Sequence, residues 1–235
     1  RLSFREMIKS ISRFLAVAAL ALVSCSTSAQ VTTDSLVNIQ KAKHYTELWG
    51  QRAALFNALG CDSTSIVMLG NSLTHGNEWH EFLGNPKVLN RGINGDIIEG
   101  ITDRIDCVVD GHPAKIFLMV SHNLTADSIA TAAGKLIDLI RTRTPNTKLY
   151  VQSLLPINNS FGRYKAMKDK EQVIRDINAL LRPMAEAKGC TWVEVHERLV
   201  DADGNLRKEW TNDGLHLLPE AYAVWREVLL PFVNE

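Results

Sequence analysis

The chain has 235 residues, which is enough for one sizeable domain and too few for two of ordinary size. Lys plus Arg and Asp plus Glu each number 26, so the net charge is zero and no broad basic surface is expected to bind nucleic acid. With 46% hydrophobic and 22% charged residues, the composition is that of a folded globular protein and excludes a disordered one. The oligomeric state has no signature in the sequence.

Residues 1–29 have the pattern of an export signal. Basic residues precede an apolar run over residues 14–23, which is too short to span a bilayer and suits a secretory signal. Two processing routes fit equally. A lipobox-like segment predicts a lipidated, membrane-anchoring Cys25, whereas cleavage after Ala29 predicts a domain over residues 30–235. Both routes predict an exported protein, in the periplasm or at the cell surface.

Three cysteines remain after the signal, namely Cys61, Cys107 and Cys190. An odd number allows at most one disulfide and leaves one thiol free. Three are also too few for a disulfide scaffold. The expected interpretation is that they are reduced thiols buried in the core.

The first half of the mature chain alternates helix and strand patterns. Apolar residues at helical spacing predict a helix over residues 37–58, and short apolar runs predict strands at residues 65–69 and 88–89. Asp96, with a glutamate three residues further on, is expected to cap the next helix in a capping box. The apolar stripe of that helix extends over residues 97–109.

The same alternation continues. Continuous apolar runs predict strands at residues 116–120 and 149–155, and helical stripes extend over residues 129–140 and 173–184. Because proline lacks an amide donor, Pro183 is expected to kink or split the second of these helices.

A fifth strand is predicted at residues 192–195, and Pro219 stands at the expected first position of the last helix. The strand runs are apolar at every position, which indicates that helices cover both faces of the sheet. We therefore predict a three-layer α/β/α fold around a five-stranded parallel sheet. In such sheets ligands bind beyond the carboxyl ends of the strands.

Polar segments rich in glycine, serine and asparagine stand at this expected ligand edge. They are residues 70–76, 90–96, 121–123 and 211–216. The segments lack the lysine of a phosphate-binding loop, the glycine spacing of a dinucleotide fingerprint and the full nucleophile elbow of α/β-hydrolases. His and Cys residues also lack the spacing of a zinc site, so neither a metal nor a cofactor is expected.

A serine hydrolase explains these segments best. Ser72 at a strand end is the expected nucleophile, although serine here can also simply cap a helix. His216 is the expected base, because Asp213 three residues earlier can accept a hydrogen bond from its Nδ1–H. His75 is the rival base.

Donors for an oxyanion are also available at this edge. The expected donors are the backbone N–H of Ser72, Gly95 and Asn123. Gly95 can alternatively serve a turn with positive φ, and Asn123 can cap the following helix.

Four of these segments carry a resemblance to a known family. They are Gly-Asn-Ser-Leu at residues 70–73, Gly-Ile-Asn-Gly-Asp at residues 92–96, Asn123, and Asp-Gly-Leu-His at residues 213–216. Their order and spacing resemble the sequence blocks of the SGNH/GDSL hydrolase superfamily. The resemblance covers about 165 residues. It implies a flavodoxin-like fold and an esterase with Ser72, His216 and Asp213 as its triad and Gly95 and Asn123 as oxyanion donors.

Two positions depart from the blocks of that superfamily. Asn71 replaces the usual Asp, which is not the triad acid. The family's Gly-x-Asn-Asp block reads Ser-His-Asn-Leu at residues 121–124, so the donor Asn123 is kept and the Gly and Asp are absent. Asn71, His122 and Asn158 are the expected substrate contacts, and Tyr164 is a further polar group near the edge.

The expected substrate is a short-chain, acetyl ester on a carbohydrate. Export suits polysaccharide or envelope esters, and no segment predicts a fatty-acid tunnel. Two alternatives stay open. One is a lysophospholipase-like or thioesterase-like acylhydrolase, and the other is a catalytically silent binding protein anchored in the envelope.

Overall fold

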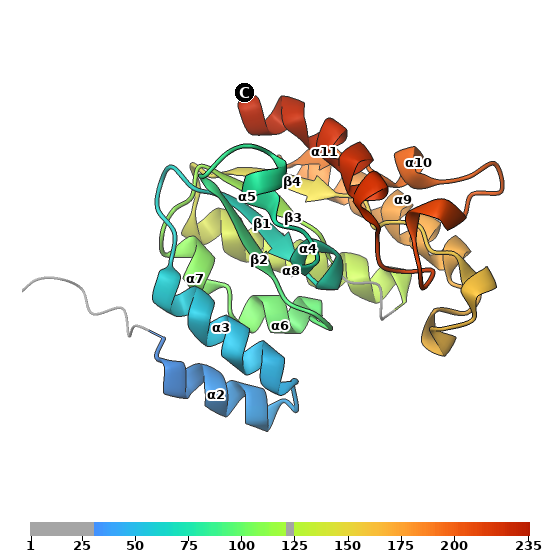
Figure 1. The fold of residues 1–235 in the computed structure, drawn as a ribbon. Helices are drawn as coiled ribbons and strands as arrows, with labels where there is room; N and C mark the ends of the chain where they lie inside the picture. The colour runs from blue at the N-terminus through green and yellow to red at the C-terminus, as the bar shows by residue number, and fades with distance from the viewer. Residues whose placement is uncertain (1–30, 121–124) are drawn as a thin grey trace, which may run out of the picture. The chain divides into compact units, whose positions relative to one another are not determined.

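The computed structural model describes residues 31–120 and 125–235. Its centre is a sheet of five strands, all parallel, in the order β2-β1-β3-β4-β5 (Figure 1). The strands are β1 (Ile66–Gly70), β2 (Val88–Gly92), β3 (Lys115–Leu118), β4 (Lys148–Gln152) and β5 (Thr191–Val193). This strand order is that of flavodoxin-like folds, so the predicted three-layer architecture is confirmed.

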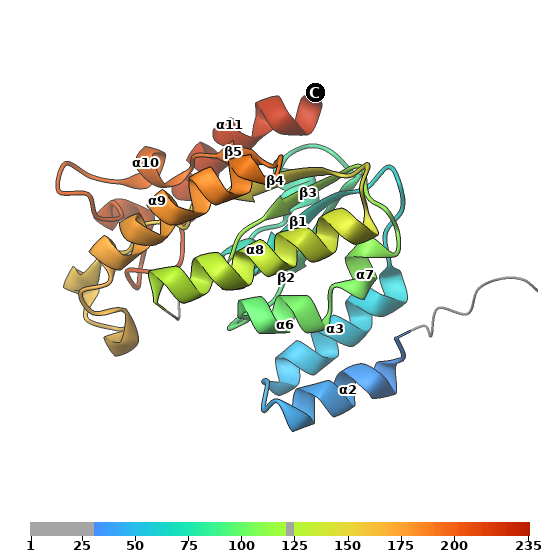
Figure 2. The ribbon, with the colours of Figure 1, turned by 180° about the vertical axis from the view of Figure 1, so that it is seen from behind.

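Helices cover both faces of the sheet. On one face, α11 (Pro219–Asn234) and α5 (Trp79–Phe82) pack on Met68, Phe117 and Tyr150, which come from three neighbouring strands. The opposite face is covered by α8 (Ala126–Arg143) and α9 (Glu171–Ala187), which lie side by side in front of the sheet in Figure 2. Successive strand residues point to opposite faces, which explains why the central strand β1 is apolar at every position. The edge strand β2 is less covered and includes Asn90 and Arg91.

The remaining helices are shorter or peripheral. They are α2 (Thr33–Ala42), α3 (Glu47–Leu59), α4 (Ser72–His75), α6 (Ile98–Asp103), α7 (Asp106–Val109) and α10 (His196–Leu199). Helix α2 packs on α3, and α3 packs on α7. No helix within residues 31–120 and 125–235 is both long and apolar enough to cross a membrane.

The helix predicted over residues 37–58 is wrong as a single element. The chain breaks after α2, where His44 has a φ of 55°. Thr46 then caps α3, because its side chain accepts a hydrogen bond from the backbone N–H of Trp49. An N-cap threonine followed by Glu47 is an ordinary start signal, and here it outweighs the continuous apolar spacing.

The capping box predicted at Asp96 is also wrong. Helix α6 begins at Ile98 with Ile97 as its N-cap and no side-chain cap. The predicted stripe over residues 97–109 is divided between α6 and α7. Asp96 has distant partners instead, described with the site below.

The helix around Pro183 is not split. Helix α9 extends from Glu171 to Ala187 with Pro183 inside it. The start predicted for the last helix is confirmed, since Pro219 occupies the first turn of α11. The three cysteines of this part of the chain are free thiols, and burial raises the pKa of Cys61 to about 11.

Three predictions lie outside the described residues. They are the export signal over residues 1–29, including the proposed lipidation of Cys25, and the roles of His122 and Asn123.

Candidate active site

The strand β1 ends at Gly70, and Ser72 begins the short helix α4 directly after it. Asn71 is the N-cap of α4, and its Oδ1 accepts a hydrogen bond from the backbone N–H of Leu73 at 3.1 Å. Asn71 is buried, so the structure gives this side chain a capping role where a substrate contact was predicted. Ser72 is half-buried at the carboxyl edge of the sheet.

The carbonyl groups of α4 are held from outside the helix. The Tyr222 hydroxyl donates to Leu73 O at 2.8 Å, and the Trp79 indole N–H donates to Thr74 O at 2.7 Å. The Asn90 amide adds a third donor at 3.1 Å from Thr74 O. Ser72 O accepts the backbone N–H of Gly76, but so short a helix leaves its later carbonyls without internal partners. The three donor side chains therefore stabilise the segment that carries Ser72.

Three predicted site residues form one continuous chain of contacts. His216 Nε2 lies 3.1 Å from Ser72 Oγ, although the two residues are 144 positions apart in the sequence. The other ring nitrogen, Nδ1, lies 2.7 Å from Asp213 Oδ2. The His216 side chain is 38% exposed and that of Asp213 is 14% exposed, so the serine–histidine end is open to solvent while the carboxylate is largely enclosed.

The carboxylate of Asp213 is surrounded by donors. Its Oδ1 accepts from the backbone N–H groups of Leu215 at 2.9 Å and His216 at 2.8 Å. Its Oδ2 accepts from the Tyr164 hydroxyl at 3.0 Å as well as facing His216. Burial by itself raises the pKa of Asp213, but the hydrogen bonds from His216, Leu215 and Tyr164 outweigh it and lower the pKa to about 2.

The loop that carries Asp213 and His216 is fixed by Asn158. The backbone N–H of Asn158 donates to Gly214 O at 2.8 Å, and its side-chain amide donates to Leu206 O at 2.7 Å. Gly214 has a φ of 88°, and a Cβ there would collide with Asn158 O, so only glycine fits. The Asn158 side chain is buried and used for packing the loop, so its predicted substrate contact is not supported.

The rival base His75 faces a different set of groups. Burial and the nearby Arg52 guanidinium lower the pKa of His75, and a hydrogen bond with Asn94 opposes that shift. The ring that contacts Ser72 Oγ is that of His216. His75 therefore serves the contact between α4 and the loop after β2.

Gly95 lies in that loop after β2, exposed, with a φ of 73°. The neighbouring Asp96 pairs with Arg104 at 2.8 Å, and both side chains are only 1% exposed. Arg104 also donates to Gly70 O at 3.1 Å, and the Trp49 indole donates to Asp96 Oδ1 at 3.1 Å. The buried pair thus connects the loop of Gly95 to the end of β1, directly before Ser72.

Replacing Arg104 with methionine is expected to lower the free energy of unfolding by about 3–5 kcal/mol, because the buried carboxylate of Asp96 loses its counter-charge. Urea denaturation measures the change. Arg143→Met is the matched control, since Arg143 is 41% exposed and pairs with Asp106 and Asp110 at the surface. Each of these two exposed ion pairs should contribute about 1 kcal/mol or less. Equal losses in both variants would contradict the assigned role of the buried pair.

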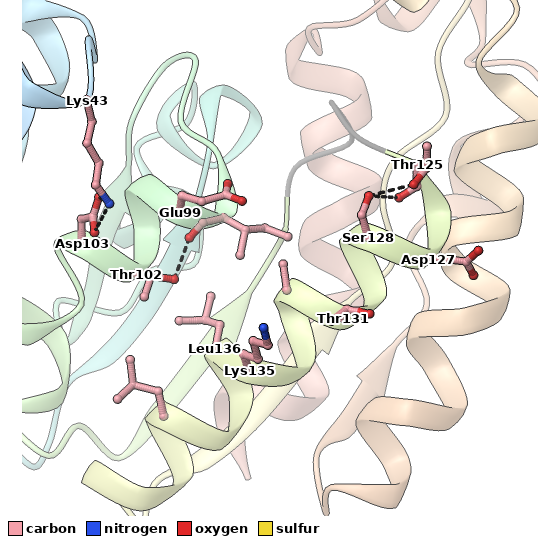
Figure 3. A pocket seen from close by; sticks show the side chains of 13 residues that line it. Lys43, Glu99, Thr102, Asp103, Thr125, Asp127, Ser128, Thr131, Lys135 and Leu136 are labelled. Atoms are coloured by element: carbon pink, nitrogen blue, oxygen red, sulfur yellow. Dashed lines mark hydrogen bonds and ion pairs between the residues drawn. The ribbon is translucent and has the colours of Figure 1, made fainter.

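One large cavity has neither Asp213 nor His216 in its lining. It is a groove of about 860 Å³ between α6 and α8, with an apolar floor that includes Ile98, Ala132 and Leu136. Figure 3 shows these two helices facing each other across the groove, with Lys135 and Glu99 at its rim. The cavity that includes Tyr164 and Asp213 measures only about 10 Å³. Within the described part of the chain, no cluster of three or more His, Cys, Asp or Glu side chains is arranged to hold a metal ion.

Residues 68–224, more than half of the chain, match the GDSL-like Lipase/Acylhydrolase family. The protein belongs to this family and is an ester hydrolase, as the resemblance of its sequence blocks implied. Among curated proteins, none has a sequence that matches this chain.

Solved structures share the fold. A proposed acylhydrolase from Bacteroides fragilis is 24% identical with a TM-score of 0.70, over 78% of this chain and 95% of its own. A GDSL-like lipase from Bacteroides thetaiotaomicron is 20% identical with a TM-score of 0.68, over 79% and 97% of the two chains. A mutant of an acetyl-xylooligosaccharide esterase from Geobacillus Stearmophilus is 12% identical with a TM-score of 0.60, over 74% and 96%.

Proposed function

We propose that the protein hydrolyses short-chain, acetyl esters of carbohydrates through a triad of Ser72, His216 and Asp213. The observation that carries the proposal is the contact chain from Asp213 Oδ2 to His216 Nδ1 at 2.7 Å and from His216 Nε2 to Ser72 Oγ at 3.1 Å. Both distances lie within the range for proton transfer between hydrogen-bonded groups.

In the proposed mechanism, Ser72 Oγ attacks the ester carbonyl carbon while His216 Nε2 takes its proton. The tetrahedral intermediate collapses to an acyl-serine, and His216 returns the proton to the departing alcohol. Water then attacks the acyl-serine by the same route and releases the acid. Asp213 holds the Nδ1–H of His216 and stabilises the positive charge that develops on the ring.

The oxyanion of each intermediate needs preorganised donors. The proposed donors are the backbone N–H groups of Ser72 and Gly95 and the side chain of Asn123. The buried pair of Asp96 and Arg104 supports the first two, because it connects the loop of Gly95 to the strand end beside Ser72.

Two considerations support a small acyl group on a sugar. Export, as residues 1–29 predict, would bring the enzyme to polysaccharide esters. One protein with the same fold acts, by its name, on acetylated xylooligosaccharides.

A long-chain acylhydrolase is the second candidate, and the groove between α6 and α8 favours it. Its volume of about 860 Å³ is in the range of small-molecule binding sites. Its two walls begin near the loops after β2 and β3, on either side of the strand that leads to Ser72. An alkyl chain extending from the ester carbon would reach an apolar floor there.

A series of p-nitrophenyl esters of increasing acyl length separates the two candidates. For the acetyl esterase, kcat/KM is highest with acetate and falls with each lengthening of the chain. A maximum at eight or more carbons, on the order of a fatty acyl chain, would favour the second candidate. In that case Ala132→Phe, which narrows the groove, should lower kcat/KM for the long esters and leave acetate hydrolysis unchanged.

A fluorophosphonate probe separates either enzyme from a silent binding protein, because it reacts only with an activated serine. Labelling mapped to Ser72 is the expected result. An unlabelled, correctly folded protein would contradict both enzyme assignments.

A further inference from the structure

Tyr164 lies against two of the proposed triad residues and comes from a separate part of the chain, the loop between β4 and α9. Its hydroxyl lies 3.0 Å from Asp213 Oδ2 and 3.3 Å from His216 Nδ1. Its ring meets the His216 ring edge-to-face, with the centroids 5.7 Å apart and an interplanar angle of 73°. The contact therefore involves both the hydroxyl and the ring of Tyr164.

The donors and acceptors fix the direction of these hydrogen bonds. An ionised carboxylate only accepts, so the Tyr164 O–H donates to Asp213 Oδ2. His216 Nδ1–H donates to the same oxygen over the shorter distance of 2.7 Å. The Tyr164 oxygen, 3.3 Å from Nδ1, is then a weaker second acceptor for that N–H. Only the tautomer with hydrogen on Nδ1 satisfies all three atoms, and it leaves Nε2 free to accept the Ser72 proton.

The two oxygens of Asp213 are held differently. Oδ1 is fixed by backbone N–H groups of its own loop, those of Leu215 and His216. Oδ2, the atom that orients the imidazole, has the Tyr164 hydroxyl as its donor from another loop. Without that donor the oxygen would depend on the His216 ring that it has to orient.

The loop of Tyr164 is anchored on the loop it supports. Asn158 bonds Gly214 O through its backbone and Leu206 O through its side chain, and its Oδ1 accepts from the backbone N–H of Ser160 at 3.1 Å. These bonds place the two loops side by side, and Tyr164 follows four residues after Ser160. The loop that carries Tyr164 is thus held by hydrogen bonds to the loop that carries Asp213 and His216.

We infer that Tyr164 is a positioning residue of the active site, which holds Asp213 Oδ2 and the plane of the His216 ring so that Nε2 faces Ser72. The inference rests on the proposed function. Tyr164 transfers no proton in this scheme, and its hydroxyl is directed at Asp213 and His216. Its effect should therefore appear in the chemical steps and not in substrate binding.

Tyr164→Phe tests the inference, because phenylalanine keeps the ring contact and removes only the hydroxyl. We expect kcat for a short-chain ester to fall roughly tenfold, as for the loss of one hydrogen bond to a charged group, with KM unchanged. The rate of fluorophosphonate labelling at Ser72 should fall by the same factor, since the probe needs an activated serine but not the natural substrate.

Tyr45→Phe is the matched control. Its hydroxyl also donates to a carboxylate, Asp103 Oδ2, at 2.8 Å, but the pair lies between α2, α3 and α6 and away from Ser72. This variant should leave kcat and the labelling rate unchanged. Urea denaturation of both variants shows whether each is folded under the assay conditions, and Tyr164→Leu is the second variant should the phenylalanine protein not fold.

Two results would overturn the inference. A raised KM with an unchanged labelling rate would make Tyr164 a substrate contact. An unchanged kcat with an unchanged labelling rate would show that Tyr164 does not affect Asp213 and His216. Failure of the proposed function gives a different result, because Ser72→Ala or His216→Ala would then retain activity whatever the effect of Tyr164→Phe.

Discussion

Ser72→Ala is expected to lower kcat/KM for ester hydrolysis by roughly four to six orders of magnitude, as removal of a triad serine does in other hydrolases. The reason is that His216 Nε2, 3.1 Å from Ser72 Oγ, then has no hydroxyl to deprotonate and no acyl-enzyme can form. The residual rate would come only from substrate binding and the oxyanion donors acting on water. Activity is measured with acetyl esters, and the acyl-enzyme by mass spectrometry of the protein.

The fold should survive this substitution. Ser72 is half-buried, and one such hydroxyl contributes only about 1 kcal/mol to stability. The side chains that hold α4, among them Tyr222 and Trp79, bind its backbone carbonyls and are unaffected. Ser128→Ala, which removes an exposed hydroxyl on α8, is the control for a serine without a catalytic role. A folded Ser72→Ala protein with more than about 1% of the wild-type activity would contradict the mechanism.

The sheet was predictable from the sequence because its signal is local. Each strand contains a short apolar run, and all five predicted strands are present, although β2 continues beyond its apolar start through Asn90 and Arg91. The helix boundaries were less predictable, because a capping side chain can bind another partner in the folded chain. The sequence predicts Asp96 as a helix cap because Glu99 follows it, but in the folded chain its carboxylate accepts hydrogen bonds from Arg104 and Trp49. A buried guanidinium next to a carboxylate outweighs one capping hydrogen bond.

The candidate site was predictable for the residues that follow strands. Parallel strands bring their carboxyl ends to one edge, so Ser72 and the Asp213–His216 pair were expected to meet, and they do. Tyr164 was predicted only as a polar group near the edge. It lies 49 residues from Asp213 in the sequence, in a loop without a periodic pattern. No local sequence pattern therefore predicts its hydrogen bond with Asp213. The burial of Asn71 and Asn158 likewise follows from packing, which the sequence pattern does not contain.

Asp213→Asn is expected to lower kcat by up to about four orders of magnitude, as in other triads. Asp213 Oδ2 accepts the Nδ1–H of His216 at 2.7 Å. An asparagine amide can present its NH₂ group to Nδ1 instead, which favours the tautomer with hydrogen on Nε2. That nitrogen then faces Ser72 Oγ as a donor and is unable to take its proton. The variant also loses the negative charge that stabilises the imidazolium in the transition state.

The matched control is His75→Ala, assayed with the same acetyl ester. This variant removes the histidine ring closest to Ser72 in the sequence. Because that ring bonds Asn94 and not Ser72, the variant should keep most of the activity.

The pH profile of kcat/KM adds a further check. The pKa of Asp213 is lowered from 3.8 to about 2, so its carboxylate is ionised at every higher pH, and its support of His216 is lost only as the pH falls through about 2. The acid limb of kcat/KM should therefore follow one protonation, that of the base, until that range is reached. Retention of more than about a tenth of the activity by Asp213→Asn, together with its loss in His75→Ala, would transfer the role of base to His75.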